Sequence, residues 1–240
     1  MSYKTQFIKI KDLPPADSFL CAHESAYLQT LRAEKRKEDW LGGRFALKVL
    51  LARESGLLPV CSLPKEGEFT VPEMSGAALA ALKNIDVVKL PSGAPQVFIG
   101  SVPDARKVSI SHSNGWAVAA VSEPNTFLGI DLEIVTHRID AWARDFFHPA
   151  ELAGGKGDEF LTSLWTKKEA IVKLLGQGLA LNSFEVQEIN GEVMLSGRAL
   201  EVYKQLDSPH ITLFTRPVLD GFICSVAYAP APQGMKFGKI

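Results

Sequence analysis

The sequence has little of several features that would assign it to a specialised class of protein. Its three cysteines, Cys21, Cys61 and Cys224, are far apart and form no CxxC pair, so their spacing indicates neither a disulfide framework nor a zinc site. The formal net charge is only -1, which excludes a global charge signature of nucleic-acid or membrane-surface binding. No stretch approaches the roughly 20 apolar residues of a membrane span, and the lysine-bearing start lacks the apolar run of a signal peptide. We therefore expect a cytoplasmic protein in a reducing compartment.

The chain does have enough apolar residues to bury a core. With 240 residues and 46% hydrophobic composition, it can form one large domain or two of about 110 to 130 residues. Glu123-Pro124-Asn125 lies between two strand-like runs near the middle of the chain, as a domain boundary would. We predict an N-terminal lobe over residues 1–123 and a C-terminal lobe over residues 124–240.

Each predicted lobe mixes helices with short β-branched runs. In the N-terminal lobe, Ala26 to Arg53 reads as helical with a break near Gly42-Gly43, and Pro72 to Leu82 reads as a second helix. Strands are predicted at residues 85–90, 108–113 and 116–123, with 91–104 as the loosest segment. The C-terminal lobe has predicted strands at 126–135, 184–189, 192–196, 211–218 and 222–229, and helices at 139–147 and 158–176. The predicted fold class is α+β, with a mostly antiparallel sheet and helices in each lobe.

The segment GIDLE, residues 129–133, places two carboxylates on one face of a predicted strand. Side chains alternate along a strand, so Asp131 and Glu133 project to the same side, about 6 to 7 Å apart. Two such acids are half of a magnesium site, because Mg²⁺ is commonly held by one or two carboxylates plus substrate phosphates. The alternative is that both acids face solvent on an amphipathic strand.

The segment SISHSNGW, residues 109–116, places His112 between Ser111 and Ser113 at a strand end. The imidazole and the hydroxyls could bind a phosphate, or His112 could be a structural residue with satisfied hydrogen bonds. The serines also suggest a metal-independent serine hydrolase, with Ser111 or Ser113 as nucleophile, His112 as base and Asp131 as its orienting acid. The sequence contains no GxSxG turn, so this alternative has weak support.

The predicted helix around WTKKEAIVK carries charge inside an apolar stripe. At ~100° per residue, one arc of roughly 120° holds mostly apolar residues, with a lysine in its middle; the arc consists of Leu161, Leu164, Trp165, Lys168, Ile171, Val172 and Leu175. Glu169 and Lys173 lie at its border and could form an ordinary surface pair. That explanation does not cover Lys168, which must either reach solvent or meet an anion.

Five motifs follow one another along the chain in a recognisable order. They are GAP (93–95), SHS (111–113), GIDLE (129–133), FFHPAE (146–151) and WTKKEAIVK followed by GQGL (165–179). In this order and approximate spacing they resemble the Sfp-type 4'-phosphopantetheinyl transferase family. In the last motif every position of the family pattern is filled, by Trp165, Thr166, Lys168, Glu169, Ala170 and Lys173.

The resemblance implies an enzyme of the holo-acyl-carrier-protein synthase type. Such an enzyme moves the phosphopantetheine arm of coenzyme A onto a serine hydroxyl of an apo acyl or peptidyl carrier protein and releases 3',5'-ADP. Asp131, Glu133 and Glu169 would hold Mg²⁺, or Mn²⁺ in its place, against the pyrophosphate. Lys168 and Lys173 would neutralise phosphate oxygens. The acceptor of the serine proton would be either Glu169 or a water on the metal.

The nucleotide of coenzyme A would contact both lobes. By the resemblance, His112 would reach the 3'-phosphate with Ser111 nearby, and Arg44 would also reach the nucleotide, with Arg36 as a weaker candidate. The stretch from residue 32 to residue 53 supports this, because seven basic residues there outnumber three acidic ones. A solvated helix face explains the same excess for every basic residue except Arg44.

One position departs from the family pattern. The family often has a basic residue between the Gly and Pro of its first motif, where this chain has Ala94, and Lys107 is the candidate replacement. The implied fold is a pseudo-dimer of two similar α+β lobes with coenzyme A between them. A monomer is then the expected state, and the expected partners include neither nucleic acid nor a membrane.

Two other classes compete with the transferase. The serine hydrolase would turn over esters without metal, and it leaves Lys168 unexplained. A catalytically inactive binding module would be expected to have lost a metal ligand or the lysines, yet all are present. The sequence therefore favours the transferase, whose phosphoryl chemistry needs positioning and charge neutralisation more than a protein nucleophile.

Overall fold

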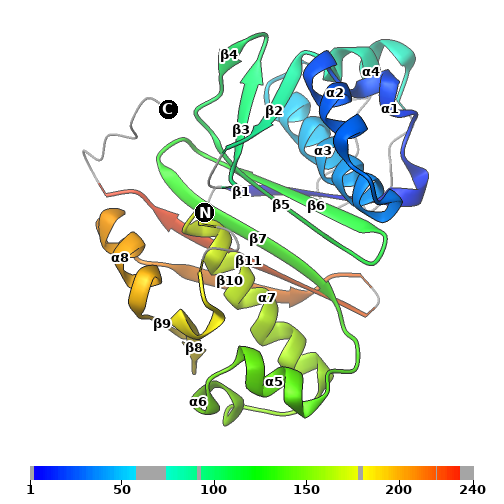
Figure 1. Ribbon diagram of the computed structural model, residues 1–240. Helices are drawn as coiled ribbons and strands as arrows, with labels where there is room; N and C mark the ends of the chain where they lie inside the picture. Colours follow the sequence, from blue (N-terminus) through cyan, green and yellow to red (C-terminus); the bar gives the residue numbers. More distant parts are fainter. Residues whose placement is uncertain (1–2, 58–73, 91–92, 178–180, 220, 233–240) are drawn as a thin grey trace.

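The structure, a computed structural model, is an α+β fold in which helices pack on antiparallel sheets (Figure 1). It describes residues 3–57, 74–90, 93–177, 181–219 and 221–232. Two three-stranded antiparallel sheets form the centre, and small hairpins and short helices surround them. The predicted α+β class is confirmed.

The first sheet carries the core of the N-terminal half. Its strands are β1 (Tyr3–Lys9), β6 (Trp116–Ser122) and β5 (Lys107–Ser113), with β6 in the middle. The helix α3 (Glu34–Glu54) packs on this sheet, and its residues 42–52 are all buried. A helix segment buried on every side needs cover on its far face as well. Phe19 supplies part of that cover, with its ring 4.9 Å from the ring of Phe45.

The second sheet carries the core of the C-terminal half. Its strands are β7 (Thr126–Ile134), β11 (Phe222–Pro230) and β10 (Thr212–Pro217), with β11 in the middle. The helix α7 (Asp158–Leu174) lies across β7 and β11. Its buried residues include Ala170, Ile171 and Leu174, which join β7 and β11 residues in one apolar cluster. The apolar stripe predicted for this helix is therefore its packing face.

The two sheets share one order of elements. Each consists of a strand, a long helix and then a hairpin, namely β1, α3 and β5–β6 in the first and β7, α7 and β10–β11 in the second. In both sheets the first strand pairs with the second strand of the hairpin. The two halves thus have matching topology, although the sequence shows no visible repeat.

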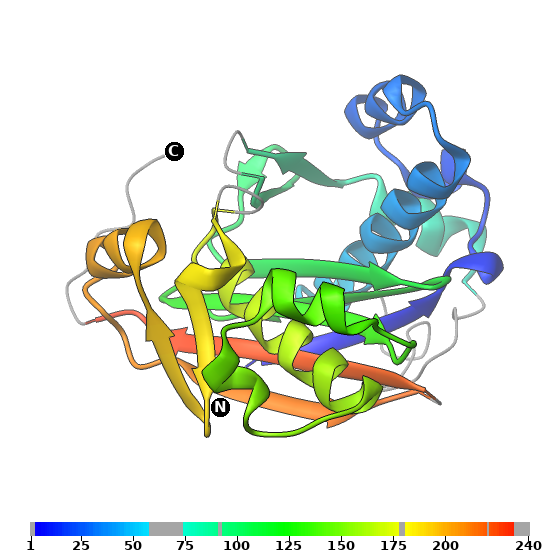
Figure 2. The ribbon, with the colours of Figure 1, turned by 60° about the horizontal axis from the view of Figure 1, so that its bottom comes forward.

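The remaining elements extend these two units. Around the first unit lie η1 (Ile10–Asp12), α1 (Ala16–Phe19), α2 (Ala22–Thr30), α4 (Gly76–Leu82) and a small sheet of β2 (Ile85–Lys89), β3 (Pro95–Ile99) and β4 (Val102–Pro103). Around the second lie α5 (Asp140–Phe146), α6 (Pro149–Leu152), η4 (Ser183–Glu185), the hairpin of β8 (Val186–Ile189) and β9 (Glu192–Leu195), and α8 (Gly197–Gln205). Figures 1 and 2 show α2 and α8 at opposite ends of the molecule.

The two sheets meet where β5 lies beside β7. Ser109 Oγ accepts the N–H of Ile130 at 3.0 Å, and Ser113 Oγ accepts the N–H of Ile134 at 3.2 Å. The contacts advance along both strands together, so β5 and β7 run in the same direction. Serine hydroxyls thus take the place of backbone carbonyls in bonding the β7 amides, which would otherwise be costly to bury. This junction brings the SHS and GIDLE segments together.

The absence of a side chain at Gly129 lets α7 approach β7 closely. An added Cβ there would lie 1.9 Å from Ala170 O and 2.6 Å from Leu174 N, both backbone atoms of α7. Gly42 and Gly43 play a similar part in α3, where added Cβ atoms would meet Ile10 and Ile110 at 2.6 and 2.7 Å. The predicted break at Gly42-Gly43 is therefore wrong, because these glycines permit close helix–sheet packing and α3 continues through them.

Other boundaries also differ from the sequence-based prediction. The helical stretch from Ala26 to Arg53 is interrupted earlier, between the end of α2 at Thr30 and the start of α3 at Glu34. The segment expected to be loosest contains β3 and β4, and β1 and α8 are elements that the sequence analysis missed. The predicted start of a helix at Pro72 lies outside the described residues. Within the described part of the chain, no helix has the length and apolarity to cross a membrane.

Replacing Gly129 by Ala tests the close approach of α7. A methyl group that collides with backbone has no flexible neighbour to yield, so we expect Gly129→Ala to lower the free energy of unfolding by about 1 to 3 kcal/mol or more. Gly76→Ala is the matched control, because an added Cβ there meets nothing within 4 Å. Urea unfolding measures both. An unchanged midpoint for Gly129→Ala would contradict the helix–strand contact described here.

Candidate functional site

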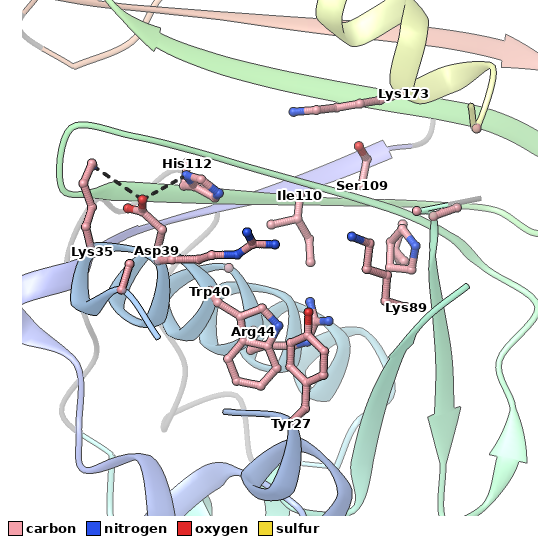
Figure 3. A pocket seen from close by; sticks show the side chains of 18 residues that line it. Tyr27, Lys35, Asp39, Trp40, Arg44, Lys89, Ser109, Ile110, His112 and Lys173 are labelled. Carbon is pink, nitrogen blue, oxygen red and sulfur yellow. Dashed lines mark ion pairs between the residues drawn. The ribbon is translucent and has the colours of Figure 1, made fainter. Parts of the chain in front are cut away.

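A cavity of about 720 Å³ lies between α2, α3, β5 and the end of α7. Figure 3 shows side chains from these elements pointing into it, with Lys173 on one wall and Tyr27, Trp40 and Arg44 on the opposite one. Its lining includes the cationic side chains of Lys35, Arg36, Arg44, Lys89 and Lys173, together with His112. Among the residues that the structure describes, the one acid in the lining is Asp39. Such a cavity favours a ligand with several negative charges.

Two aromatic rings form an apolar wall beside these cations. The rings of Tyr27 and Trp40 lie 5.4 Å apart. The guanidinium carbon of Arg44 lies 4.8 Å from the centre of the Trp40 ring. A flat apolar group with an attached anion fits such a wall, because the ring faces offer stacking area and the arginine offers charge.

Arg44 is almost buried and lacks a full set of partners. The residue is 8% exposed, and its Nε has no hydrogen-bond partner although it is buried. The nearest acid, Glu24, lies 3.9 Å from Nε, beyond hydrogen-bond range. Burial lowers the pKa of Arg44, although nearby negative charges act in the opposite direction. A bound anion would supply the missing acceptor.

His112 lines the cavity and lies close to charged groups of both signs. Its Nδ1 lies 3.6 Å from Asp39 Oδ2, and Lys35 lies 3.5 Å from the same oxygen. Burial lowers the pKa of His112, Asp39 counteracts this, and the charges of Lys173 and Lys35 lower it further. The imidazole is therefore neutral near pH 7 without a ligand, and an anion in the cavity would favour its protonation.

Asp131 is the centre of a buried network beside this cavity. Its Oδ1 accepts hydrogen bonds from Ser111 Oγ at 2.7 Å and from Lys173 Nζ at 2.8 Å. Lys173 Nζ also donates to Ile130 O at 3.0 Å. Asp131 Oδ2 is buried and has no partner. A buried carboxylate oxygen without a donor is what a cation would satisfy.

Glu133 and Glu169 complete a group of acids around Asp131. Burial and then the charge of Asp131 raise the pKa of Glu133, whose Oε2 accepts from Ser113 Oγ at 3.0 Å. Burial raises the pKa of Glu169, and the charges of Asp131 and Glu133 raise it further. Three acids that repel one another in a half-buried place fit a divalent cation by their chemistry. The carboxylate oxygens of these three acids do not all lie within 4.8 Å of one another in the part of the chain that the structure describes.

Lys168 does not line the cavity, contrary to the prediction that it would contact the phosphates. Its Nζ donates to both carboxylate oxygens of Glu151, at 3.1 and 2.9 Å, and to Phe146 O at 2.9 Å. The residue is 1% exposed, and burial lowers its pKa while Glu151 raises it. The anion that the sequence analysis required beside Lys168 is therefore Glu151. Lys168 therefore joins α7 to α6 through its ion pair with Glu151, and its side chain does not reach the cavity.

Ser111 also has a different part from the predicted one. It is 6% exposed, and its hydroxyl donates directly to Asp131 instead of facing the cavity. A serine–histidine–aspartate triad needs the imidazole between serine and acid. Here the closest acid to His112 is Asp39 on α3. The serine hydrolase built on Ser111, His112 and Asp131 is therefore wrong.

The basic residue near Ala94 is Lys89. Lys89, Gly93 and Ala94 line the cavity, and Lys89 pairs with Pro95 across the β2–β3 hairpin. Lys107, the predicted replacement, is not part of the cavity lining. Lys89 could not be found from the sequence. It lies before the loop and the GAP motif lies after it, and only the hairpin places the two opposite each other. Tyr27 and Trp40 were missed as well, since nothing in their local pattern separates them from core aromatics.

Part of the chain is similar to known proteins. Residues 127–222 match the model of the 4'-phosphopantetheinyl transferase superfamily. The chain is 30% identical over 125 residues to the 4'-phosphopantetheinyl transferase gsp of Aneurinibacillus migulanus, covering 49% of this chain and 49% of that protein. It is 25% identical over 177 residues to a putative 4'-phosphopantetheinyl transferase of Synechocystis sp., covering 70% of this chain and 61% of that protein. The chain thus spans about half or somewhat more of these relatives.

A solved structure is similar in part. It is described as the Chronobacterium ammoniagenes ACPS-CoA complex, and the match has a TM-score of 0.37 with 16% sequence identity. The match covers 45% of this chain and 98% of that chain.

The pairing of Lys168 with Glu151 predicts a structural effect. Lys168→Met leaves Glu151 as an uncompensated buried charge, so we expect the free energy of unfolding to fall by about 3 to 5 kcal/mol. Lys156→Met, on an exposed lysine, is the control and should change stability little. Urea unfolding followed by circular dichroism measures both. A Lys168→Met protein as stable as the wild type would show that Lys168 is not held as described.

The raised pKa of Glu169 predicts a pH dependence for the protein in a chelator. When the folded state raises the pKa of a carboxyl, ionisation costs stability above the folded pKa, and the cost is absent below the ordinary glutamate value of about 4.3. Glu169→Gln removes this cost, so we expect the variant to be more stable than wild type near pH 7 and equal to it near pH 4. Urea midpoints at the two pH values measure the difference. A larger advantage near pH 4 would contradict the assigned repulsion, and Glu159→Gln serves as the exposed control.

Proposed function

We propose that the chain is a member of the 4'-phosphopantetheinyl transferase superfamily, whose model matches residues 127–222, and that it transfers the 4'-phosphopantetheine arm of coenzyme A to a serine hydroxyl of an apo acyl or peptidyl carrier protein. The observation that carries the proposal is the cavity itself. One wall holds Arg44 with a buried, unpartnered nitrogen, and the other holds Lys173 bonded to Asp131. The nucleotide of coenzyme A carries a 3'-phosphate and a 5'-pyrophosphate, so it offers one anionic group to each wall.

The nucleotide part of coenzyme A fits the wall formed by α2 and α3. Its adenine would lie against Tyr27 and Trp40, and its phosphate groups would meet Arg44, Arg36 and His112. Arg44 then gains the acceptor that its Nε lacks. The phosphate also favours the imidazolium form of His112, because an opposite charge stabilises the protonated ring. Arg36 is exposed at the rim and would contribute less.

The acids beside the cavity suit a hard divalent cation, Mg²⁺ or Mn²⁺. Asp131, Glu133 and Glu169 would hold it, with the unpartnered Oδ2 of Asp131 as the fitting donor. Such a cation supplies charge neutralisation for a pyrophosphate. Ser111 and Ser113 orient the first two acids by donating to their other oxygens. The two serines are positioning residues in this proposal.

Lys173 and Glu169 would act on the reacting groups. Lys173 faces the cavity and would neutralise oxygens of the pyrophosphate. The serine oxygen of the carrier forms a bond to phosphorus, the phosphoanhydride bond breaks, and 3',5'-ADP leaves. The serine proton passes to Glu169. Lys168 contributes by holding α6 against α7 through Glu151.

The matching topology of the two sheets supports a pseudo-dimer of two lobes. In this interpretation the lobes are residues 1–123 and 124–240, and coenzyme A binds at their junction, where β5 lies beside β7. One chain then supplies both halves of the site. A monomeric, cytoplasmic enzyme is the expectation that accompanies this arrangement.

Transfer to a carrier protein is the direct test. We expect incubation with coenzyme A, Mg²⁺ and an apo carrier protein to add the mass of one phosphopantetheine to the carrier, measured by mass spectrometry. Asp131→Asn should lower the rate by about a hundredfold or more, because it removes charge at the reacting group. No mass gain with a panel of apo acyl and peptidyl carriers would refute the proposal.

The same assay tests Lys89 as the substitute for the basic residue missing at Ala94. Lys89→Ala should lose a phosphate contact, which would raise the KM for coenzyme A about tenfold and leave kcat unchanged. Lys83→Ala, an exposed lysine of the same region that does not line the cavity, is the control. Equal KM values for the two variants would remove Lys89 from the proposed site.

A further inference from the structure

A cluster of metal-ligating side chains lies outside the carboxylate site, where α2 meets β2. Cys21 precedes α2, Glu24 lies in its first turn, and Asp86 belongs to β2. The Cys21 sulfur and one carboxylate oxygen from each acid all lie within 4.8 Å of one another. This is the one such set of three in the part of the chain that the structure describes. The transferase mechanism proposed above uses none of these residues.

Two different ligand types point at one oxygen in this cluster. Cys21 Sγ donates to Asp86 Oδ1 at 3.3 Å, and His23 Nδ1 lies 3.2 Å from the same atom. Ligand atoms around a tetrahedral zinc are roughly 3.3 to 3.5 Å apart, given bonds of about 2.3 Å to sulfur and 2.0 Å to nitrogen or oxygen. The observed separations match that spacing. His23 has a side chain 55% exposed, so its ring has room to turn toward the sulfur.

Glu24 is held in place by other bonds and can still share an oxygen. Its Oε2 accepts the N–H of Cys21 and its Oε1 accepts the N–H of Val87, both at 3.2 Å. It also pairs with Lys48. Lys48 Nζ has two further acceptors, the carbonyl oxygens of residues 19 and 82 at 3.0 and 3.2 Å. A cation at Glu24 would therefore not leave the buried ammonium without partners.

Helix capping explains only part of this arrangement. Glu24 closes a capping box with Cys21, which accounts for its bond to the Cys21 amide. Capping requires neither the sulfur nor His23 to converge on Asp86, which comes from a strand more than sixty residues away in sequence. The convergence of thiol, imidazole and carboxylate on one point is the unexplained feature.

We propose that Cys21, His23, Glu24 and Asp86 form a binding site for a divalent cation of the Zn²⁺ class. Zn²⁺ accepts sulfur, nitrogen and carboxylate oxygen as tetrahedral ligands, whereas Mg²⁺ and Ca²⁺ take oxygen ligands. On binding, the Cys21 thiol releases its proton to solvent as the metal–sulfur bond forms. The site is chemically distinct from the carboxylate group around Asp131 and selects a different cation.

A cation here would connect to the cavity through α2. Glu24 lies 3.9 Å from Arg44 Nε, and Tyr27 of the same helix lines the cavity. Joining Cys21 before α2, and His23 and Glu24 within it, to Asp86 of β2 would hold that wall in one position. The cation is therefore placed to stabilise the nucleotide side of the cavity without taking part in the chemistry.

Cobalt titration of the whole chain tests the site, since Co²⁺ reports thiolate ligation by a charge-transfer absorption in the near ultraviolet. After treatment with a chelator, we expect one equivalent of Co²⁺ to produce this band and Zn²⁺ to displace it. Cys21→Ser should abolish the band. Cys224→Ser, on a buried cysteine far from the cluster in sequence, should retain it. Asp86→Asn and His23→Ala should weaken the binding of Co²⁺ by roughly tenfold to a hundredfold or more.

Two results would overturn the site: no band in the wild type at saturating Co²⁺, or a band that persists in Cys21→Ser. The test is independent of the transferase proposal. Asp131→Asn should lose transfer but keep the cobalt band, whereas Cys21→Ser should lose the band whether or not the chain transfers phosphopantetheine.

Discussion

The close packing of α7 on β7 at Gly129 is the constraint on which the candidate site depends. With no Cβ in the way, backbone atoms of Ala170 and Leu174 lie against the strand. That approach brings Lys173 within 2.8 Å of Asp131 and places Glu169 where burial and then the charge of Asp131 raise its pKa. A larger residue at this point would separate the helix from the strand and with it the lysine from the acid.

A second constraint holds the other half of the site in register. The serines of β5 bond to backbone amides and to carboxylates of β7, so SHS and GIDLE cannot slide past each other without breaking these bonds. His112 lies between two of these serines on the same strand and faces the cavity. The junction therefore positions the acids and the histidine from one set of hydrogen bonds. It also explains why small hydroxyl residues flank the histidine.

Charge in the molecule is divided between two roles. Buried pairs such as Lys168 with Glu151, and Lys48 with Glu24, are compensated within the chain and join helices to their neighbours. The cations that line the cavity face a space with few acids, and the acids around Asp131 repel one another. An excess of cations in the cavity and of acids around Asp131 is the feature that separates binding groups from structural ones. Sequence patterns alone do not show this difference.

The sequence by itself determined the α+β class and most of the strands and helices, because alternation and helical period are local properties. Only the tertiary structure decided which anion Lys168 meets, that Ser111 holds Asp131, that Lys89 faces the first motif and that Gly42-Gly43 continues a helix. Each of these depends on which distant segment lies opposite a residue. A buried charge or a glycine is compatible with several such neighbours, and packing selects one of them.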